Sequence, residues 1–265
     1  MRSETATRPT RLAILEADTP VPKIKEKYGP YGKVFTYLFK RACDSLDPPK
    51  PLESVLDIKA YDVVVADGSN LPTYPKVGDI DAVLITGAKH NAFEDREWIL
   101  RLVAYTRECF DAGVPVVGIC FGHQIVARAL GAQVGRNDRG WELSVIPCEL
   151  TDAGKKLFKL EKLFIQQMHQ DIVYSIPEGV TQLARTDVCP NQGMYQPGRL
   201  LTVQGHPEFT ADMMRNILDV RVSMGIISED LYADGTARAA DAQDGVAVAR
   251  AFLRFFREKP EQLLK

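Results

Sequence analysis

The sequence lacks long apolar runs and any excess of positive charge. In 265 residues no apolar stretch approaches the roughly 20 residues that a membrane-spanning helix needs, and the segment up to Arg11 has no apolar centre like that of a signal peptide. The formal net charge is -2 and the pI is near 6.1, so no broad basic field favours nucleic-acid binding. We therefore expect a cytoplasmic protein that binds neither nucleic acid nor membranes.

Cysteine is scarce, and its spacing follows no metal-binding or disulfide pattern. The five cysteines, at positions 43, 109, 120, 148 and 189, are odd in number and irregularly placed, which predicts free thiols in a reducing compartment. The His169-Gln-Asp171 segment has no partner cluster at a usual ligand spacing. The sequence thus predicts no metal and no cofactor.

The chain also contains neither a P-loop nor a Ser-Gly-Gly-x-Asp nucleotide-binding loop. Both motifs hold nucleotide phosphates through glycine-rich backbone, and an ATP-using synthase half would need one of them. Any such half must therefore be a separate protein.

What the sequence does contain is an apolar strand that ends in a turn of small residues around Cys120. Gly118 and Gly122 flank the cysteine, where a sharp strand-to-helix turn would crowd any Cβ against the backbone. The residues from 124 to 130 predict a helix that ends at Gly131, and a helix N-terminus favours a thiolate. Cys120 is therefore a candidate nucleophile, with a buried structural cysteine as the alternative.

A second apolar strand, at 200–204, leads into His206 and Glu208. A thiol nucleophile needs an imidazole to take its proton, and the imidazole needs a group that fixes its tautomer. A backbone-bonded histidine and a solvated carboxylate are the alternatives for these two residues. The chain order Cys, His, Glu differs from the Ser, Asp, His order of α/β-hydrolases, so the turn does not indicate that fold.

At 118–124 (GICFGHQ) and 204–209 (QGHPEF) the chain resembles the class I (triad) glutamine amidotransferase family. The similarity runs from about residue 60 to 210, with weaker matches at 85–88, 140–142 and 168–171. The resemblance implies that Cys120 attacks the carbonyl of a γ-glutamyl amide. It also implies that His206 moves the proton, that Glu208 holds His206, and that water releases glutamate from a γ-glutamyl thioester.

The resemblance further implies an oxyanion hole built from the backbone N–H groups of Gly87 and Phe121. At this position the family more often has Gly-Gly-Pro where this chain has Gly87-Ala-Lys, so an ordinary turn is the alternative for Gly87. Gln124 closes the matched motif and is implied as a contact to the bound γ-glutamyl group. Its alternative is a surface glutamine.

The strand and helix patterns predict an α/β fold. Strand-like runs alternate with helical patterns; the strands are expected at 11–15, 62–66, 82–86, 114–119 and 200–204, and the helices at 34–44 and 97–111. This order predicts a mostly parallel central sheet covered by helices on both faces, flavodoxin-like and of the class I glutamine amidotransferase type. Sites in such folds gather at the carboxyl ends of the strands.

The remaining segments extend this fold into one domain, 1–265. Strands at 143–150 and 180–189 are expected as an antiparallel extension of the motif core, about 60–210. The segment 211–265 is expected to be helical, with a methionine-rich buried face. The polar stretch 234–244 is expected as a loop beside the active site or on an oligomer surface, and Lys23–Lys27 as a solvated loop.

Three functions are consistent with these residues. A stand-alone hydrolase or peptidase acting on a small γ-glutamyl compound is favoured, because the chain has no nucleotide-binding loop. The first alternative is a glutaminase subunit that delivers ammonia to a separate synthase. The second is a catalytically silent member that binds a metabolite or a protein partner, against which the intact Cys120, His206 and Glu208 argue. The γ-glutamyl substrate and the oligomeric state are not determined by the sequence.

Overall fold

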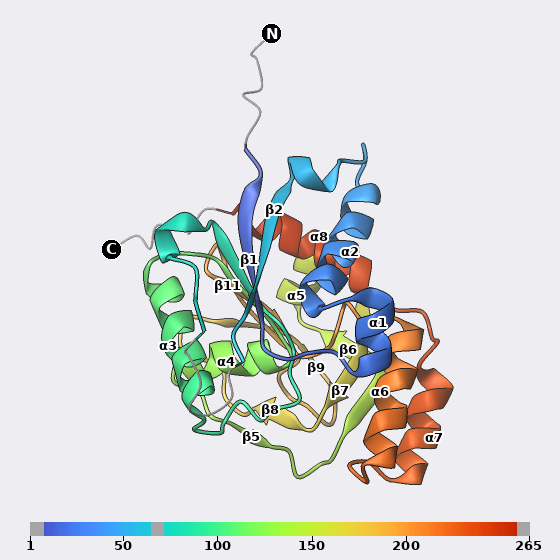
Figure 1. Cartoon of the computed structure of the whole chain (residues 1–265). Helices are drawn as coiled ribbons and strands as arrows, with labels where there is room; N and C mark the ends of the chain where they lie inside the picture. Colours follow the sequence, from blue (N-terminus) through green and yellow to red (C-terminus); the bar gives the residue numbers. More distant parts are fainter. Residues whose placement is uncertain (1–7, 65–71, 259–265) are drawn as a thin grey trace.

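A nine-stranded sheet forms the centre of the computed structural model, which describes residues 8–64 and 72–258 (Figure 1). Five of its strands are β1 (Thr10–Glu16), β2 (Leu56–Asp62), β3 (Ala82–Ile85), β4 (Val116–Ile119) and β11 (Leu200–Val203). They lie side by side in the order β2-β1-β3-β4-β11, and all four pairings are parallel. This parallel half confirms the predicted α/β architecture.

Four antiparallel strands continue the sheet beyond β11. They are β10 (Gly193–Gln196), β9 (Thr181–Arg185), β6 (Glu142–Leu150) and β7 (Lys162–His169), in this spatial order. The expected antiparallel extension is thus confirmed. Two short strands, β5 (Val134–Arg136) and β8 (Asp171–Val173), pair in a separate antiparallel sheet.

The second strand lies earlier in the chain than the sequence pattern predicts. The expected strand at 62–66 is wrong in its position, because β2 ends at Asp62 and residues 65–66 lie outside the described part. This strand is at the edge of the sheet and is half exposed, so it has no continuous apolar run. A prediction that looks for continuous apolar residues places the strand at the valines that follow it instead.

Helices cover both faces of the sheet, as Figure 1 shows. On one face lie α2 (Tyr31–Asp44), α5 (Asp152–Phe158) and α8 (Gly245–Phe255); on the other lie α3 (Glu97–Asp111) and α4 (Phe121–Ala129). Alternate side chains of β1 enter the two cores: Leu12 and Ile14 pack with α2 and α8, and Ala13 and Leu15 pack with α3. A strand segment that is buried on both faces must be apolar, as residues 12–15 of β1 are.

A third cluster lies beside the sheet and brings together α1 (Pro22–Tyr28), α6 (Ala211–Ser223) and α7 (Glu229–Arg238). The predicted methionine-rich face of α6 is confirmed, since Met213, Met214 and Leu218 are buried there. Two single-turn 3-10 helices, at Leu52–Ser54 and Val77–Asp79, complete the elements.

Of two segments expected as loops, Lys23–Lys27 is helical throughout and 234–244 is helical as far as Arg238, whereas 239–244 is a loop as expected. Lys23–Lys27 lies within α1, which Pro22 begins and Ile24 anchors in the third cluster. Asp234–Arg238 forms the last turns of α7, because tertiary contacts hold a segment whose composition favours a loop. The Arg238 guanidinium donates to the backbone oxygens of Leu143 and Val145 at 2.8 and 2.9 Å.

All five cysteines are free and buried. Among the helices of residues 8–64 and 72–258, none has the length and apolar character that spanning a membrane requires.

Candidate functional site

Cys120 occupies a strained turn between β4 and α4. Its backbone has φ 50° and ψ -102°, a conformation that non-glycine residues rarely adopt and that is common at functional sites. A Cβ at Gly118 would lie 2.6 Å from the Gly122 oxygen, and one at Gly122 would lie 2.3 Å from the Ile85 oxygen. The turn therefore requires glycine on both sides of the cysteine, as the sequence predicts.

His206 lies immediately beyond the end of β11, beside this turn. Because β4 and β11 are neighbouring parallel strands, their carboxyl ends meet at one edge of the sheet. The His206 backbone N–H donates to the Gln166 oxygen at 2.7 Å, and the ring and Cys120 both lie beside Gly87. The Nδ1 atom lies 2.8 Å from Glu208 Oε1. The three candidate catalytic side chains thus lie together at this edge of the sheet.

The ring of Phe209 covers one face of His206. The two rings are parallel, with 3° between their planes and 4.1 Å between their centroids. Together with Glu208, this stacking restricts the imidazole to one orientation. The sequence motif contains Phe209, but the motif alone does not predict the stacking.

The ionisation of His206 depends on burial and on its neighbours, above all Glu208. His206 and Glu208 are only 4% and 5% exposed. Burial lowers the pKa of His206, but the neighbouring Glu208 and Cys120 oppose this effect more strongly and raise the pKa to about 10. The site therefore favours the protonated form of the ring.

We expect Glu208→Gln to lower the pKa of His206 markedly. The neutral amide removes the carboxylate charge that raises this pKa, whereas the burial that lowers it remains. An NMR titration of the imidazole measures this pKa, and Glu26→Gln, at an exposed position of α1, is the matched control.

The stability of the fold should also depend on the protonation of His206. Since the folded pKa of about 10 exceeds the ordinary 6.5, the protonated ring stabilises the fold below about pH 6.5, and this contribution is lost as pH rises toward 10. A wild-type ring that titrates below pH 6.5 would contradict the account.

Gly87 and Phe121 place their backbone beside the same three side chains. A Cβ on Gly87 would lie 2.6 Å from His206 Cε1 and 3.7 Å from Cys120 Cβ. No acceptor for the Gly87 N–H is found in residues 8–64 and 72–258. Phe121 begins α4, and the first N–H groups of a helix have no intrahelical acceptor. Both groups are therefore candidates for an oxyanion hole.

A cavity of about 200 Å³ adjoins Cys120 and has a mostly polar lining. Gln124 lines it and is buried, and its Nε2 atom donates to the Asp171 backbone oxygen at 2.9 Å and to Gln204 Oε1 at 3.1 Å. A contact from Gln124 to a γ-glutamyl group would therefore use the other end of its amide. Arg136 Nε lies 2.7 Å from Asp171 Oδ1 on the same wall.

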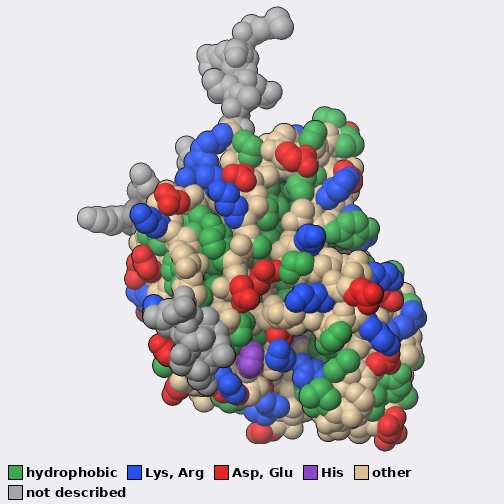
Figure 2. Space-filling view, viewed as in Figure 1, with side chains coloured by type: hydrophobic (Ala, Val, Ile, Leu, Met, Phe, Trp, Pro, Cys, Tyr) green, Lys and Arg blue, Asp and Glu red, His purple; other side chains and the backbone are tan. Residues whose placement is uncertain are grey.

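Arg136 and Asp171 were not among the predicted site residues. Burial raises the pKa of Asp171, and the Arg136 charge opposes this rise. For Asp171 the only sequence signal was the weak family match at 168–171. Arg136 had no such signal, because it comes from the separate strand β5. In Figure 2, basic side chains gather beside a histidine below the middle of the visible face.

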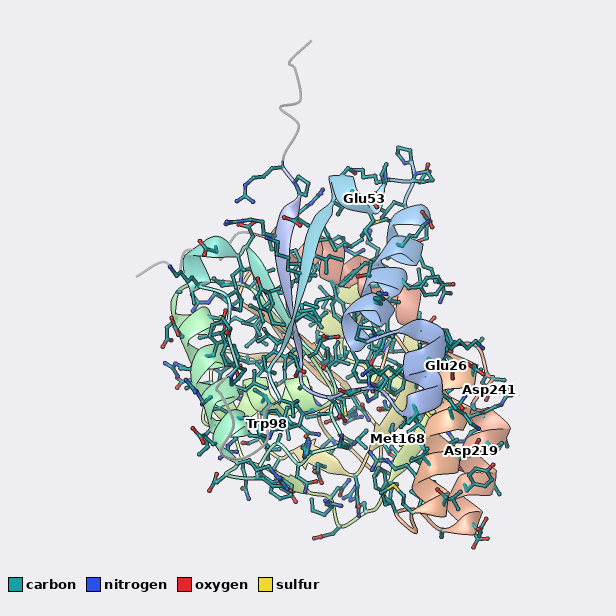
Figure 3. The ribbon with its side chains drawn as sticks, in the orientation of Figure 1. Glu26, Glu53, Trp98, Met168, Asp219 and Asp241 are labelled. Carbon is teal, nitrogen blue, oxygen red and sulfur yellow. The ribbon has the colours of Figure 1, made fainter. Side chains whose placement is uncertain are left out.

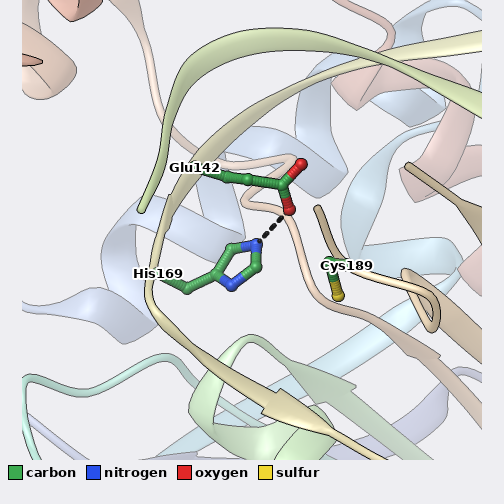
Figure 4. Close-up of side chains that lie close together, drawn as sticks. All are labelled: Glu142, His169 and Cys189. Carbon is green, nitrogen blue, oxygen red and sulfur yellow. Dashed lines mark ion pairs between the residues drawn. The ribbon is translucent and has the colours of Figure 1, made fainter. Parts of the chain in front are cut away.

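Figure 4 shows a second group of Cys, His and Glu side chains, of which His169 also lines this cavity. His169 Nε2 lies 3.0 Å from Glu142 Oε2, and Cys189 completes a buried set whose donor atoms all lie within 4.8 Å of one another. Sequence spacing does not reveal this group, because its members come from β6, from β7 and from the loop after β9.

Each member of this second group has protein partners. Thr186 Oγ1 and Gln192 Nε2 donate to the Glu142 carboxylate at 2.6 and 2.7 Å, and the Cys189 thiol donates to the Asn191 oxygen. His169 Nδ1 lies 3.1 Å from the Asp171 oxygen. These contacts form a buried network that supports the cavity wall. The absence of a metal stays a prediction.

Comparisons with known proteins agree with the motifs. The model of the family "Glutamine amidotransferase class-I" matches residues 60–220. A glutamine amidotransferase-like protein of Schizosaccharomyces pombe is 33% identical over 252 residues, which cover 93% of this chain and 98% of that protein. Gamma-glutamyl peptidase 5 of Arabidopsis thaliana is 30% identical over 241 residues, covering 88% of this chain and 89% of the peptidase.

A solved structure has the same fold. The crystal structure of a glutamine amidotransferase from Thermotoga maritima superposes with a TM-score of 0.69 at 18% sequence identity. The match covers 95% of this chain and all of that one. From the family match and the relatives, this chain belongs to the class I glutamine amidotransferase family.

Proposed function

We propose that this protein hydrolyses a γ-glutamyl amide bond through a thioester on Cys120. One observation carries the proposal: a buried His206 ring is bonded to Glu208 and lies beside Cys120 at the end of the neighbouring strand. This is the arrangement that nucleophilic catalysis by a thiol needs.

In the first step the Cys120 sulfur attacks the side-chain amide carbon of the γ-glutamyl group. A C–S bond forms, and the negative charge that develops on the carbonyl oxygen is stabilised by the N–H groups of Gly87 and Phe121. His206 then donates its proton to the amide nitrogen. The C–N bond breaks, and the amine leaves.

In the second step water attacks the thioester carbon, and His206 takes a proton from that water. The C–S bond breaks, glutamate is released and the sulfur returns to its starting state. Glu208 holds the ring in one orientation throughout. Gln124 contributes to the binding of the γ-glutamyl group.

The γ-glutamyl peptidase among the relatives supports a peptide or conjugate as substrate. We expect the purified protein to release glutamate from a γ-glutamyl dipeptide with no partner present. The measurement is glutamate release from the dipeptide and from free glutamine, with the α-linked isomer of the dipeptide as the control that should remain intact.

Turnover of glutamine alone would instead favour an ammonia donor for a separate synthase. No release from either compound would overturn the proposal and favour a silent binding member.

A further inference from the structure

A second, larger cavity of about 420 Å³ adjoins the first on the side of His206. The first cavity is lined by Cys120 and the second by His206 and Gly87, and both are lined by Ala88, Lys89, Met168 and Arg221. In the proposed reaction the amine leaves after His206 has protonated it. A leaving group bonded to the scissile carbonyl would therefore extend into the second cavity.

The walls of the second cavity are largely apolar. They come from the turn before α1, from α6 and the residue that follows it, and from the residue stacked on His206: Pro20, Val21, Ile217, Val220, Met224 and Phe209. Met168, at the end of β7, lies on the boundary between the two cavities; Figure 3 labels it near the helices that complete the wall. Such a lining favours the burial of an apolar group.

The size of the cavity exceeds what free glutamine needs. Glutamine releases ammonia, and a molecule of this size, like water, takes up about 30 Å³. The cavity of about 420 Å³ is within the range of small-molecule pockets, roughly 300 to 1,000 Å³. A bulky leaving amine would fill much of this cavity, whereas ammonia would occupy only a small part of it and water would fill the rest.

Arg221 places a cation at the boundary of the two cavities. Lys89, the other cation there, is paired with Asp18, with 2.6 Å between Lys89 Nζ and Asp18 Oδ1. The Arg221 side chain has no ion pair or hydrogen bond within the described ranges 8–64 and 72–258. In a γ-glutamyl amino acid, the free carboxylate lies one carbon from the scissile nitrogen. This short distance from the scissile bond would place the carboxylate near the boundary of the two cavities, where the Arg221 cation can bind it.

We propose that the second cavity is the leaving-group subsite and that the substrates are γ-glutamyl conjugates of amino acids with large apolar side chains. Arg221 binds the free carboxylate of the leaving amino acid, and Val220, with its apolar neighbours on α6, contacts the side chain. This inference rests on the proposed function.

The apolar wall is tested by comparing kcat/KM for γ-glutamylphenylalanine and γ-glutamylglycine. We expect the wild type to prefer the phenylalanine compound by about tenfold to one hundredfold, the worth of burying one aromatic side chain. Val220→Asp should reduce this preference by about tenfold or more, because it places a charge against the ring.

The role of Arg221 is tested with γ-glutamylphenylalanine and its C-terminal amide, which lacks the carboxylate. Arg221→Gln should lower kcat/KM for the free acid about tenfold more than for the amide. Arg215→Gln, at an exposed position of the same helix, is the matched control and should leave the ratio unchanged.

A binding measurement separates the failure of this inference from that of the proposed function. Cys120→Ala should bind γ-glutamylphenylalanine more tightly than γ-glutamylglycine in calorimetry, whether or not the wild type hydrolyses them. Equal binding of the two compounds, or ratios unchanged by Val220→Asp and Arg221→Gln, would overturn the leaving-group subsite. Absence of hydrolysis by the wild type with preferential binding intact would overturn only the hydrolytic reaction.

Discussion

Replacing Cys120 with alanine is expected to abolish glutamate release, with a loss of about 10⁴-fold or more in kcat. The thioester requires a sulfur at this position, and neither water nor another side chain at the site replaces it. Alanine retains the Cβ, so the turn between β4 and α4 and its glycine contacts are preserved. The fold should therefore remain intact.

The measurement is a turnover assay accompanied by a thermal melt. Cys109→Ala is the matched control, because Cys109 is a buried thiol on α3, outside the lining of both cavities. The control should keep near wild-type turnover. Turnover by Cys120→Ala within a few-fold of the wild type would exclude this cysteine as the nucleophile.

Gly122→Ala is expected to destabilise the fold by about 3 kcal/mol, the upper part of the usual range for overpacking. The added Cβ would lie 2.3 Å from the Ile85 backbone oxygen and 2.9 Å from its carbonyl carbon. Because Ile85 lies in a central strand, it cannot move away without disturbing the pairing of β3 with β4. The helix must shift instead, and Cys120 shifts with it.

Chemical denaturation measures this loss directly. Gly78→Ala is the matched control, because a Cβ there meets no heavy atom within 4 Å, and its unfolding free energy should change little. If Gly122→Ala unfolds at the wild-type midpoint, then the close approach of α4 to β3 does not hold in solution.

The sequence predicted the parts of the site that depend on local geometry. Cys120 between two glycines and His206 at the end of an apolar strand each identify a strand end, and strand ends of a parallel sheet meet at one edge. The parallel half of the sheet followed from the same short apolar runs. The edge strand β2 was misplaced, because an exposed edge does not require a continuous apolar run.

The remaining features arise from contacts between distant segments. The pair Arg136–Asp171 joins two strands of the small sheet, and Glu142, His169 and Cys189 meet from three segments. No spacing along the chain indicates such contacts. The second cavity likewise forms only where the turn before α1 packs near α6.

The central claim is that Cys120, His206 and Glu208 act as one unit that forms a γ-glutamyl thioester. The most direct test is rapid acid quenching during turnover of a γ-glutamyl dipeptide, followed by mass spectrometry of the intact protein and of its peptides. The account predicts a mass increase of one γ-glutamyl group, located on Cys120 and absent from Cys120→Ala. Steady glutamate release with the acyl group on a different residue would contradict it.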